Sequence, residues 1–273
     1  MINFMKQKVL VCYLITKFDN EQTLEDFIYN YKINNSGLNH DLLICFKLLD
    51  INQINLFKNI LNEINYIEFF DNSILNDYDL GSYQRVAKAF SSRHIFFLNS
   101  FSYPVCDLWL KKIVDNYENN SVVATSASYG SLLSSLKLKK FYKIIGYYLK
   151  LFNYKKKFNP FPNPHIRTTG FLIKASDYLS YMSNKTIKSK EDAWCIESGK
   201  KSLTNYLKNH AFKIFVVNSN GDKFAEKEWK LSETFNYSNQ EKSIISDKHI
   251  RKYLELNNNG KKKITFNTWG CID

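Results

Sequence analysis

The first half of the chain alternates between short apolar runs and segments in which apolar residues recur every three or four positions. The runs are rich in β-branched and aromatic residues, which predicts strands buried on both faces. The recurring spacing predicts amphipathic helices between them. We expect strands at 8–15, 41–46, 66–70, 94–98 and 122–126, and helices at 24–31, 54–64, 82–91 and 104–117.

Two of these helices have recognisable start signals. Thr23 and Asp26 have the spacing of a capping box at the start of the first helix. Ser102 is expected to cap the fourth helix, with Pro104 as its first residue, because proline tolerates that position well.

Strands and helices that alternate in this way predict an α/β fold, a mostly parallel central sheet with helices on both faces. The second half is less regular, with one or two helices over 132–157, a strand at 168–174, a helix at 198–209 and a strand at 213–217. No repeat or flexible linker divides the chain. We therefore expect one domain over residues 1–217, with residues 218–273 as a C-terminal extension packed on it.

Composition narrows the class of partner. The chain has 273 residues, and 38 Lys+Arg against 26 Asp+Glu give a net charge of +12, which indicates an anionic partner. Nucleic acid, a phosphorylated ligand and an anionic membrane face all remain open. The five cysteines form no C-x-x-C pair and do not cluster with histidines, which disfavours zinc and fits free thiols of a reducing cytoplasm. No apolar run approaches a membrane span, and the N-terminus lacks a signal-peptide pattern, so we expect a cytoplasmic protein.

Neither the dinucleotide-binding G-x-G-x-x-G nor the P-loop motif occurs in the chain, so its candidate chemistry rests on local clusters. Ligands of parallel sheets bind at the carboxyl ends of the strands, where the first two clusters lie. In 77–85, Gly81 would let a ligand come close to the backbone, and Arg85, one helical turn further on, could face an anion. The alternative is that a carboxylate of this segment simply caps the helix. In 96–104, Asn99 lies where a sugar or metal would be held; the alternative is a simple turn.

The next two clusters offer groups for catalysis. Segment 159–171 holds three of the four prolines, and its rigidity would bring His165 and Arg167 to one place; the alternative is a stiff connector. In 191–200, Glu197 follows two apolar residues, and partial burial would raise its pKa and suit it to act as a general base. The alternative is an exposed carboxylate at a helix N-terminus.

The last cluster is 229–235, with His249 and Arg251 further along the chain. Trp229 either belongs to the core or stacks on a sugar ring, and the core is the default.

Taken in order, five segments resemble bacterial polysaccharide glycosyltransferases of capsule, O-antigen and rhamnan type, which have a GT-A, Rossmann-like nucleotide-sugar fold. The resemblance covers roughly residues 8–255, and its most specific parts are P-N-P-H-I-R-T and E-S-G-x-x-S-L-T. The five segments are D-L-G-S-Y, F-L-N-S-F-S-Y-P with a following helix that contains Trp109, P-N-P-H-I-R-T-T-G-F, E-S-G-K-K-S-L-T and W-K-L-S-E-T-F.

The resemblance implies a nucleotide-sugar half over about 1–128 and an acceptor half over about 129–217. It implies inverting transfer of a hexosyl or deoxyhexosyl group, with Glu197 as the base that deprotonates the acceptor and Asp192 as the fallback. The residues implied in donor binding are Thr16, Asp71, Asp79, Gly81, Arg85, Asn99 and Ser100. Those implied around the diphosphate and acceptor are His165, Arg167, Trp229, His249 and Arg251.

The chain departs from the family at its metal-binding motif. Asn99 and Phe101 stand at the ends of the usual D-x-D, where neither is a carboxylate. Dependence on Mn²⁺ or Mg²⁺ and independence of metal are therefore both open.

Other classes compete with this interpretation. A nucleotidyltransferase acting on a sugar phosphate usually has a glycine-rich loop after the first strand, and residues 13–18 contain no glycine. An α/β module that binds nucleic acid or another polyanion without catalysis fits the charge of +12. The basic residues of such a module should form one stripe. Here they are distributed along the whole chain, except for two concentrations at 137–157 and 261–263. We therefore expect a nucleotide-sugar donor and a saccharide or lipid-linked saccharide acceptor, and no nucleic acid.

The basic, aromatic segment 132–157 suggests a further partner. It could dock on the anionic inner face of the cytoplasmic membrane, or it could simply cover the acceptor side of the core.

Overall fold

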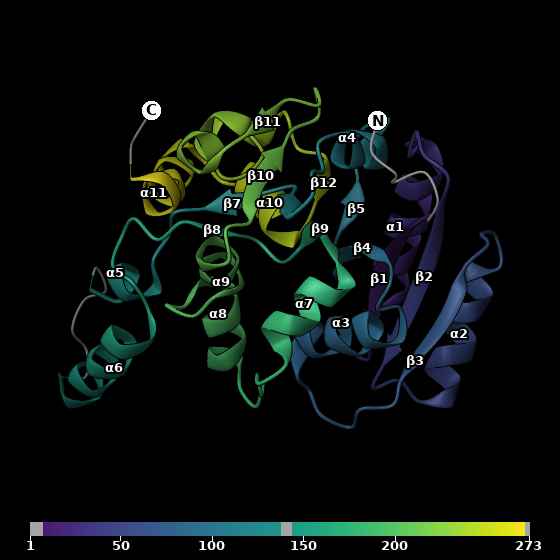
Figure 1. Ribbon diagram of the computed structural model, residues 1–273, viewed down its shortest axis with the longest axis horizontal. Coiled ribbons are helices and arrows are strands. Elements are labelled where there is room, and N and C mark those ends of the chain that lie inside the picture. The colour runs from purple at the N-terminus through teal and green to yellow at the C-terminus, as the bar shows by residue number, and fades with distance from the viewer. Residues whose placement is uncertain (1–7, 138–143, 271–273) are drawn as a thin grey trace.

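The computed structural model describes residues 8–137 and 144–270 and places an eight-stranded sheet at its centre (Figure 1). The strand order is β11-β10-β6-β9-β4-β1-β2-β3. Six of these strands point the same way, and β9 and β11 are antiparallel to their neighbours. The strands are β1 (Val9–Thr16), β2 (His40–Lys47), β3 (Ile67–Asp71), β4 (His94–Leu98), β6 (Ser121–Ala124), β9 (Gly170–Lys174), β10 (Lys213–Val217) and β11 (Lys223–Phe224).

Helices cover both faces of the sheet, which confirms the predicted α/β class. On one face lie α3 (Tyr78–Ala89), α7 (Ala175–Met182), α8 (Lys190–Ser198) and α9 (Leu203–Asn209). On the other lie α1 (Glu21–Ile33), α2 (Ile51–Leu61) and α4 (Trp109–Asp115). Strand β1 shows why its sequence is apolar throughout: Leu10 and Cys12 belong to the first core, and Val11 and Tyr13 to the second.

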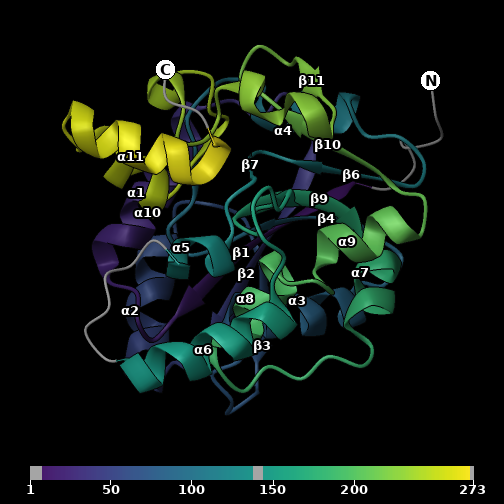
Figure 2. The same cartoon turned by 90° about the vertical axis from the view of Figure 1, so that its left-hand side faces the viewer.

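The remaining elements lie outside the main sheet. Helices α5 (Leu132–Lys137) and α6 (Ile144–Lys157) lie together at the edge of the molecule (Figure 1), and residues 138–143 of the predicted helical segment fall outside the described residues. Short strands pair β5 (Tyr103–Pro104) with β12 (Ile245–Ser246) and β7 (Ala127–Ser128) with β8 (His165–Ile166). Figure 2 shows α10 (Lys248–Leu254) and α11 (Asn258–Trp269) beside each other; two 3₁₀ segments, Glu226–Ser232 and Ser238–Gln240, precede them.

Strand pairing ties residues 218–270 to the rest of the chain. β11 extends the main sheet, and β12 pairs with β5. The four described cysteines are free thiols. Cys271 and the N-terminal residues 1–7, to which the signal-peptide prediction refers, lie outside the described residues.

The predicted start of the fourth helix is wrong. Pro104 lies in β5 opposite Ile245, and the helix begins only at Trp109. Ser102 caps nothing, because its hydroxyl donates to the side chain of Asn99 and to the carbonyl of Thr169.

Several other helix boundaries also differ from the expectation. α1 is capped by Asn20, which accepts from the backbone N–H of Thr23, so the predicted capping box is wrong. α3 begins at Tyr78, four residues earlier than expected. The predicted helix 198–209 is split, since α8 ends at Ser198 and Ser202 caps α9.

Candidate functional site

Two adjoining cavities open at the carboxyl ends of the parallel strands, where ligands of such sheets bind. The smaller one, about 240 Å³, lies beside the ends of β1 and β2 and is lined by Thr16, Lys47 and Ser100 among others. The larger one, about 480 Å³, lies between α8 and the loop that follows β8. Tyr78, Asp79 and Asn99 line both, so the two cavities form one continuous cleft.

Glu197 lies in the larger cavity at the last turn of α8. Ser189 and Asp192 form a capping box that fixes the start of this helix. Gly199 closes it, and a Cβ there would come within 2.5 Å of the carbonyl oxygen of Cys195. One Glu197 carboxylate oxygen accepts from the backbone N–H of Thr168 at 3.3 Å. Both ends of α8 thus position this carboxylate at the cleft.

Asp79 lies where the two cavities join. Burial, and then the negative charge of Glu197, raise the pKa of Asp79 to about 6. A carboxyl group with such a pKa can hold or release a proton near neutral pH. The site therefore contains two neighbouring carboxyl groups that need not both be ionised.

Two histidines line the same cavity as Glu197. The Nδ1 atom of His165 donates to the carbonyl oxygen of Asn163 at 2.8 Å, which leaves Nε2 of the neutral ring as an acceptor. Burial lowers the pKa of His165, although Glu197 acts in the opposite direction. Burial also lowers the pKa of His249, with the charge of Arg167 adding to the effect. A bound anion would favour the charged form of both rings.

Arg167 lines the cavity, but its charge is already paired. Its guanidinium lies 2.6 Å from an Asp247 carboxylate oxygen and stacks 3.9 Å from the centre of the Phe235 ring. Both members of the pair are almost fully buried. The other Asp247 oxygen caps α10 through the N–H groups of His249 and Ile250. Arg167 therefore joins the loop after β8 to α10, which carries His249.

The segment Asn99–Phe101 does not fit a carboxylate-bound divalent cation. The Asn99 side-chain oxygen already accepts from the Ser102 hydroxyl at 2.6 Å and from the Phe101 N–H at 3.3 Å. Nowhere in residues 8–137 and 144–270 do three His, Cys, Asp or Glu side chains gather as a metal site would need. Cations of α10 lie beside the segment instead: Arg251 donates to the Phe101 carbonyl at 3.1 Å, and the Lys248 ammonium lies 5.1 Å from the Phe101 ring centre.

A network of four charges adjoins the smaller cavity, which Lys47 lines. Arg85 binds Asp71 through Nε at 2.5 Å and Nη2 at 2.6 Å, and reaches Asp77 through Nη1 at 2.7 Å. Lys47, only 1% exposed at its side chain, pairs with Asp77 and donates to the Tyr78 carbonyl. The Arg85 charge, which the sequence suggested could face a bound anion, is thus paired with two carboxylates of the protein itself.

Gly81 belongs to the same network. A Cβ at this position would lie 2.1 Å from the Asp77 carboxylate. Glycine is therefore needed here to make room for the Asp77 side chain, and not for a bound ligand. Lys47 and Asp77 were not among the residues selected from sequence. A lysine at the end of an otherwise apolar strand was the signal that could have identified the first of them.

The other predicted residues lie in several places. Thr16 lines the smaller cavity and donates from N and Oγ1 to Asp19 at 2.7 and 2.8 Å. Trp229 is fully buried in the first hydrophobic core, so it offers no face to a sugar. Asp192 lines a separate cavity on another side of α8 and does not reach Glu197's cavity. Arg251 stacks on Tyr103 at 4.8 Å.

No family model and no curated protein sequence matches the chain. Among solved structures, the chain is similar to 4-diphosphocytidyl-2C-methyl-D-erythritol synthase from Anaerococcus prevotii, at 12% identity over 83% of this chain and 94% of that one, with a TM-score of 0.45. A nucleotidyl transferase from Methanothermobacter thermautotroptrophicus aligns at 8% identity over 74% and 96%, TM-score 0.42. A mannosyltransferase from S. cerevisiae aligns at 12% over 65% and 60%, TM-score 0.36. All three TM-scores are below 0.5, so we base neither a family nor an activity on them.

Proposed function

We propose that the protein is a glycosyltransferase that moves a sugar from a nucleotide-sugar donor to a saccharide or lipid-linked saccharide acceptor in cell-surface polysaccharide synthesis, with inversion. The observation that carries the proposal is the two-part cleft at the carboxyl ends of the strands, with Asp79 at its junction and Glu197 facing the larger part. A cleft of this form can hold two substrates with their reacting atoms at the junction.

The smaller cavity is the proposed nucleotide site. Leu14 and Phe18 offer apolar contacts for a base, and the cavity ends at Asn99–Phe101. The donor diphosphate would lie beside this segment, where Lys248 and Arg251 of α10 supply positive charge. Because this segment offers amide and hydroxyl oxygens but no carboxylate, the proposed step assigns no role to a metal.

Glu197 is the proposed base in a single displacement. It takes the proton of the acceptor hydroxyl while that oxygen attacks the anomeric carbon. The bond from this carbon to the donor's diphosphate oxygen breaks on the opposite side, and the nucleoside diphosphate leaves with the bonding electrons. The cations of α10 and His249 stabilise the negative charge that develops on it.

Thermal unfolding with UDP, GDP, dTDP, CDP and CMP, each with Mn²⁺ or EDTA, tests the donor site. A ligand that binds only the folded state raises the melting temperature. We expect one nucleotide to do so and the rise to persist in EDTA. No rise with any nucleotide, together with tight heparin binding, would favour the polyanion-binding module instead.

Release of nucleoside diphosphate from the matching sugar donor then tests the base. Glu197→Gln should keep nucleotide binding and lose about 10²–10⁴-fold in turnover. The exposed Glu228→Gln, next to the 3₁₀ segment's Trp229, is the control and should retain full activity. Full turnover in Glu197→Gln would remove Glu197 from this role.

A further inference from the structure

Helix α6 has two apolar faces. One packs on the protein: Leu151 and Tyr154 join Phe158 in a small core with Leu133 and Leu136 of α5. The other projects outward, where the exposed fractions of Tyr148, Leu149 and Phe152 are 58%, 69% and 62%. The helical spacing of these three residues puts them on one stripe. Large apolar groups that gather on one exposed face of a helix are typical of an interaction surface.

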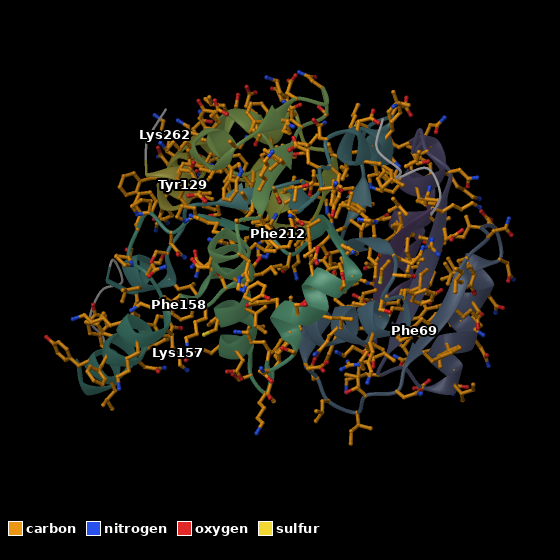
Figure 3. The ribbon with its side chains drawn as sticks, in the orientation of Figure 1. Phe69, Tyr129, Lys157, Phe158, Phe212 and Lys262 are labelled. Atoms are coloured by element: carbon orange, nitrogen blue, oxygen red, sulfur yellow. The ribbon has the colours of Figure 1, made fainter. Side chains whose placement is uncertain are left out.

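Positive charge surrounds the end of the same helix. Lys155, Lys156 and Lys157 form its last turn, and a cavity of about 330 Å³ lies next to it. Figure 3 shows Lys157 and Phe158 at this edge of the molecule. The lysines that line the cavity are Lys156, Lys157, Lys185, Lys200 and Lys201.

These lysines are not neutralised by their surroundings. Asp192 is the carboxylate in the cavity wall, and Glu191 pairs with Lys157 at 2.5 Å. Five lysines against these two carboxylates leave a surplus of three positive charges. Burial and the neighbouring charge of Lys201 lower the pKa of Lys185, so an anion placed between them would relieve repulsion. The cavity therefore favours a negatively charged group.

We propose that the exposed stripe of α6 and the adjoining lysine cavity together bind the surface of an anionic lipid bilayer. Tyr148, Leu149 and Phe152 would enter the boundary between headgroups and acyl chains, and the lysines would meet the lipid phosphates. The combination of an apolar stripe with net positive charge fits a bilayer rather than a soluble anion, which would leave the stripe uncovered. In the part of the chain that the structure describes, no helix is long and apolar enough to cross a membrane.

This docking has a consequence that rests on the proposed function. Leu132 and Ser135 of α5 line the larger cavity, and α5 packs on α6. Docking would bring the acceptor side of the cleft to the lipid surface, which favours a lipid-linked acceptor.

Vesicle flotation tests the docking and needs no turnover, so its failure would leave the transferase proposal standing. The full chain is mixed with vesicles of phosphatidylcholine, with or without phosphatidylglycerol, at low and high salt. We expect it to float with the anionic vesicles and to bind less at high salt. Absence of flotation, or equal flotation with neutral vesicles, would overturn the proposal.

Two sets of variants test the place of contact. Tyr148→Ser/Leu149→Ser/Phe152→Ser should lower partitioning about tenfold or more, and Lys155→Gln/Lys156→Gln about fivefold per lysine. Ile74→Ser/Leu75→Ser, at positions 90% and 60% exposed, and Lys262→Gln/Lys263→Gln are matched controls and should change nothing. Equal loss in the controls would overturn the assignment. So would a dimer in solution that the serine variant dissociates, since the stripe would then bind a second copy.

Discussion

Replacing Asp77 with asparagine would remove one negative charge from the buried network while keeping the size of the side chain. Arg85 would retain its two contacts with Asp71, but Lys47 would lose its only ion-pair partner among the described residues. The Lys47 side chain is 1% exposed and that of Asp77 10%, so water cannot replace the lost charge. Breaking such a pair from one side costs about 3–5 kcal/mol.

For a chain of this length that cost corresponds to a fall in melting temperature of roughly 10 °C. Urea unfolding should show the same loss in the free energy of unfolding. Asp115→Asn is a suitable control, because its pair with Lys111 is about half exposed and contributes at most about 1 kcal/mol. The double variant Asp77→Asn/Lys47→Met should recover much of the loss, since it also removes the unpaired cation.

The effect should depend on pH with a defined sign. Burial alone would raise the pKa of Asp77, but Arg85 and Lys47 together hold this pKa below its usual value. The stability that this charge provides is therefore present above the unfolded pKa of about 3.9 and is lost as pH falls through the lower folded pKa. The difference between wild type and Asp77→Asn should persist from neutral pH to about 4 and shrink below it. A variant as stable as wild type at pH 7 would refute the reasoning.

Three further outcomes are expected. Burial and the charge of Glu197 raise the pKa of Asp79 to about 6, so the ionised carboxylate destabilises the fold above that pH. Asp79→Asn should therefore raise the free energy of unfolding by up to about 3 kcal/mol at pH 7.5 and by little at pH 3.5, as measured by thermal unfolding. Trp229→Ala should cost about 3–5 kcal/mol in urea unfolding, whereas a surface residue that stacks on sugar would cost little. Gly81→Ala, whose Cβ would displace the Asp77 carboxylate, should destabilise about as much as Asp77→Asn; an unchanged unfolding midpoint would contradict the crowding at that position.

The sheet could be predicted where the burial of a strand is visible in the strand's own sequence. β1 is apolar throughout because both of its faces lie in cores, and its sequence shows this directly. The sequence of β9 does not reveal that this strand lies antiparallel between β4 and β6, because strand direction depends on connections made far along the chain. Ser102 and Pro104 carry a helix-start signal, yet their partners Thr169 and Ile245 are distant in sequence and decide the outcome.

The candidate site was predictable to a similar extent. His165 stands out because it lies in a proline-rich segment and Glu197 because it follows two apolar residues, whereas Asp79 is implied only by the family resemblance; all three line one cavity. The pairing of Arg85 could not be foreseen, because its two carboxylate partners lie 8 and 14 residues away and the network closes through Lys47 on another strand. An arginine in a sequence predicts an anionic partner, but the sequence does not show whether that anion is a ligand or, as for Arg85, a carboxylate of the same chain.

The ion pair between Arg167 and Asp247 sets a rule for engineering this protein. The arginine comes from the loop after β8 and the aspartate from the start of α10, so neither segment can be exchanged alone without leaving a buried charge unmatched. A chimera that imports a different C-terminal region must bring the 165–169 loop with it. Segment exchanges in this protein should therefore move the two ends of this contact as one unit.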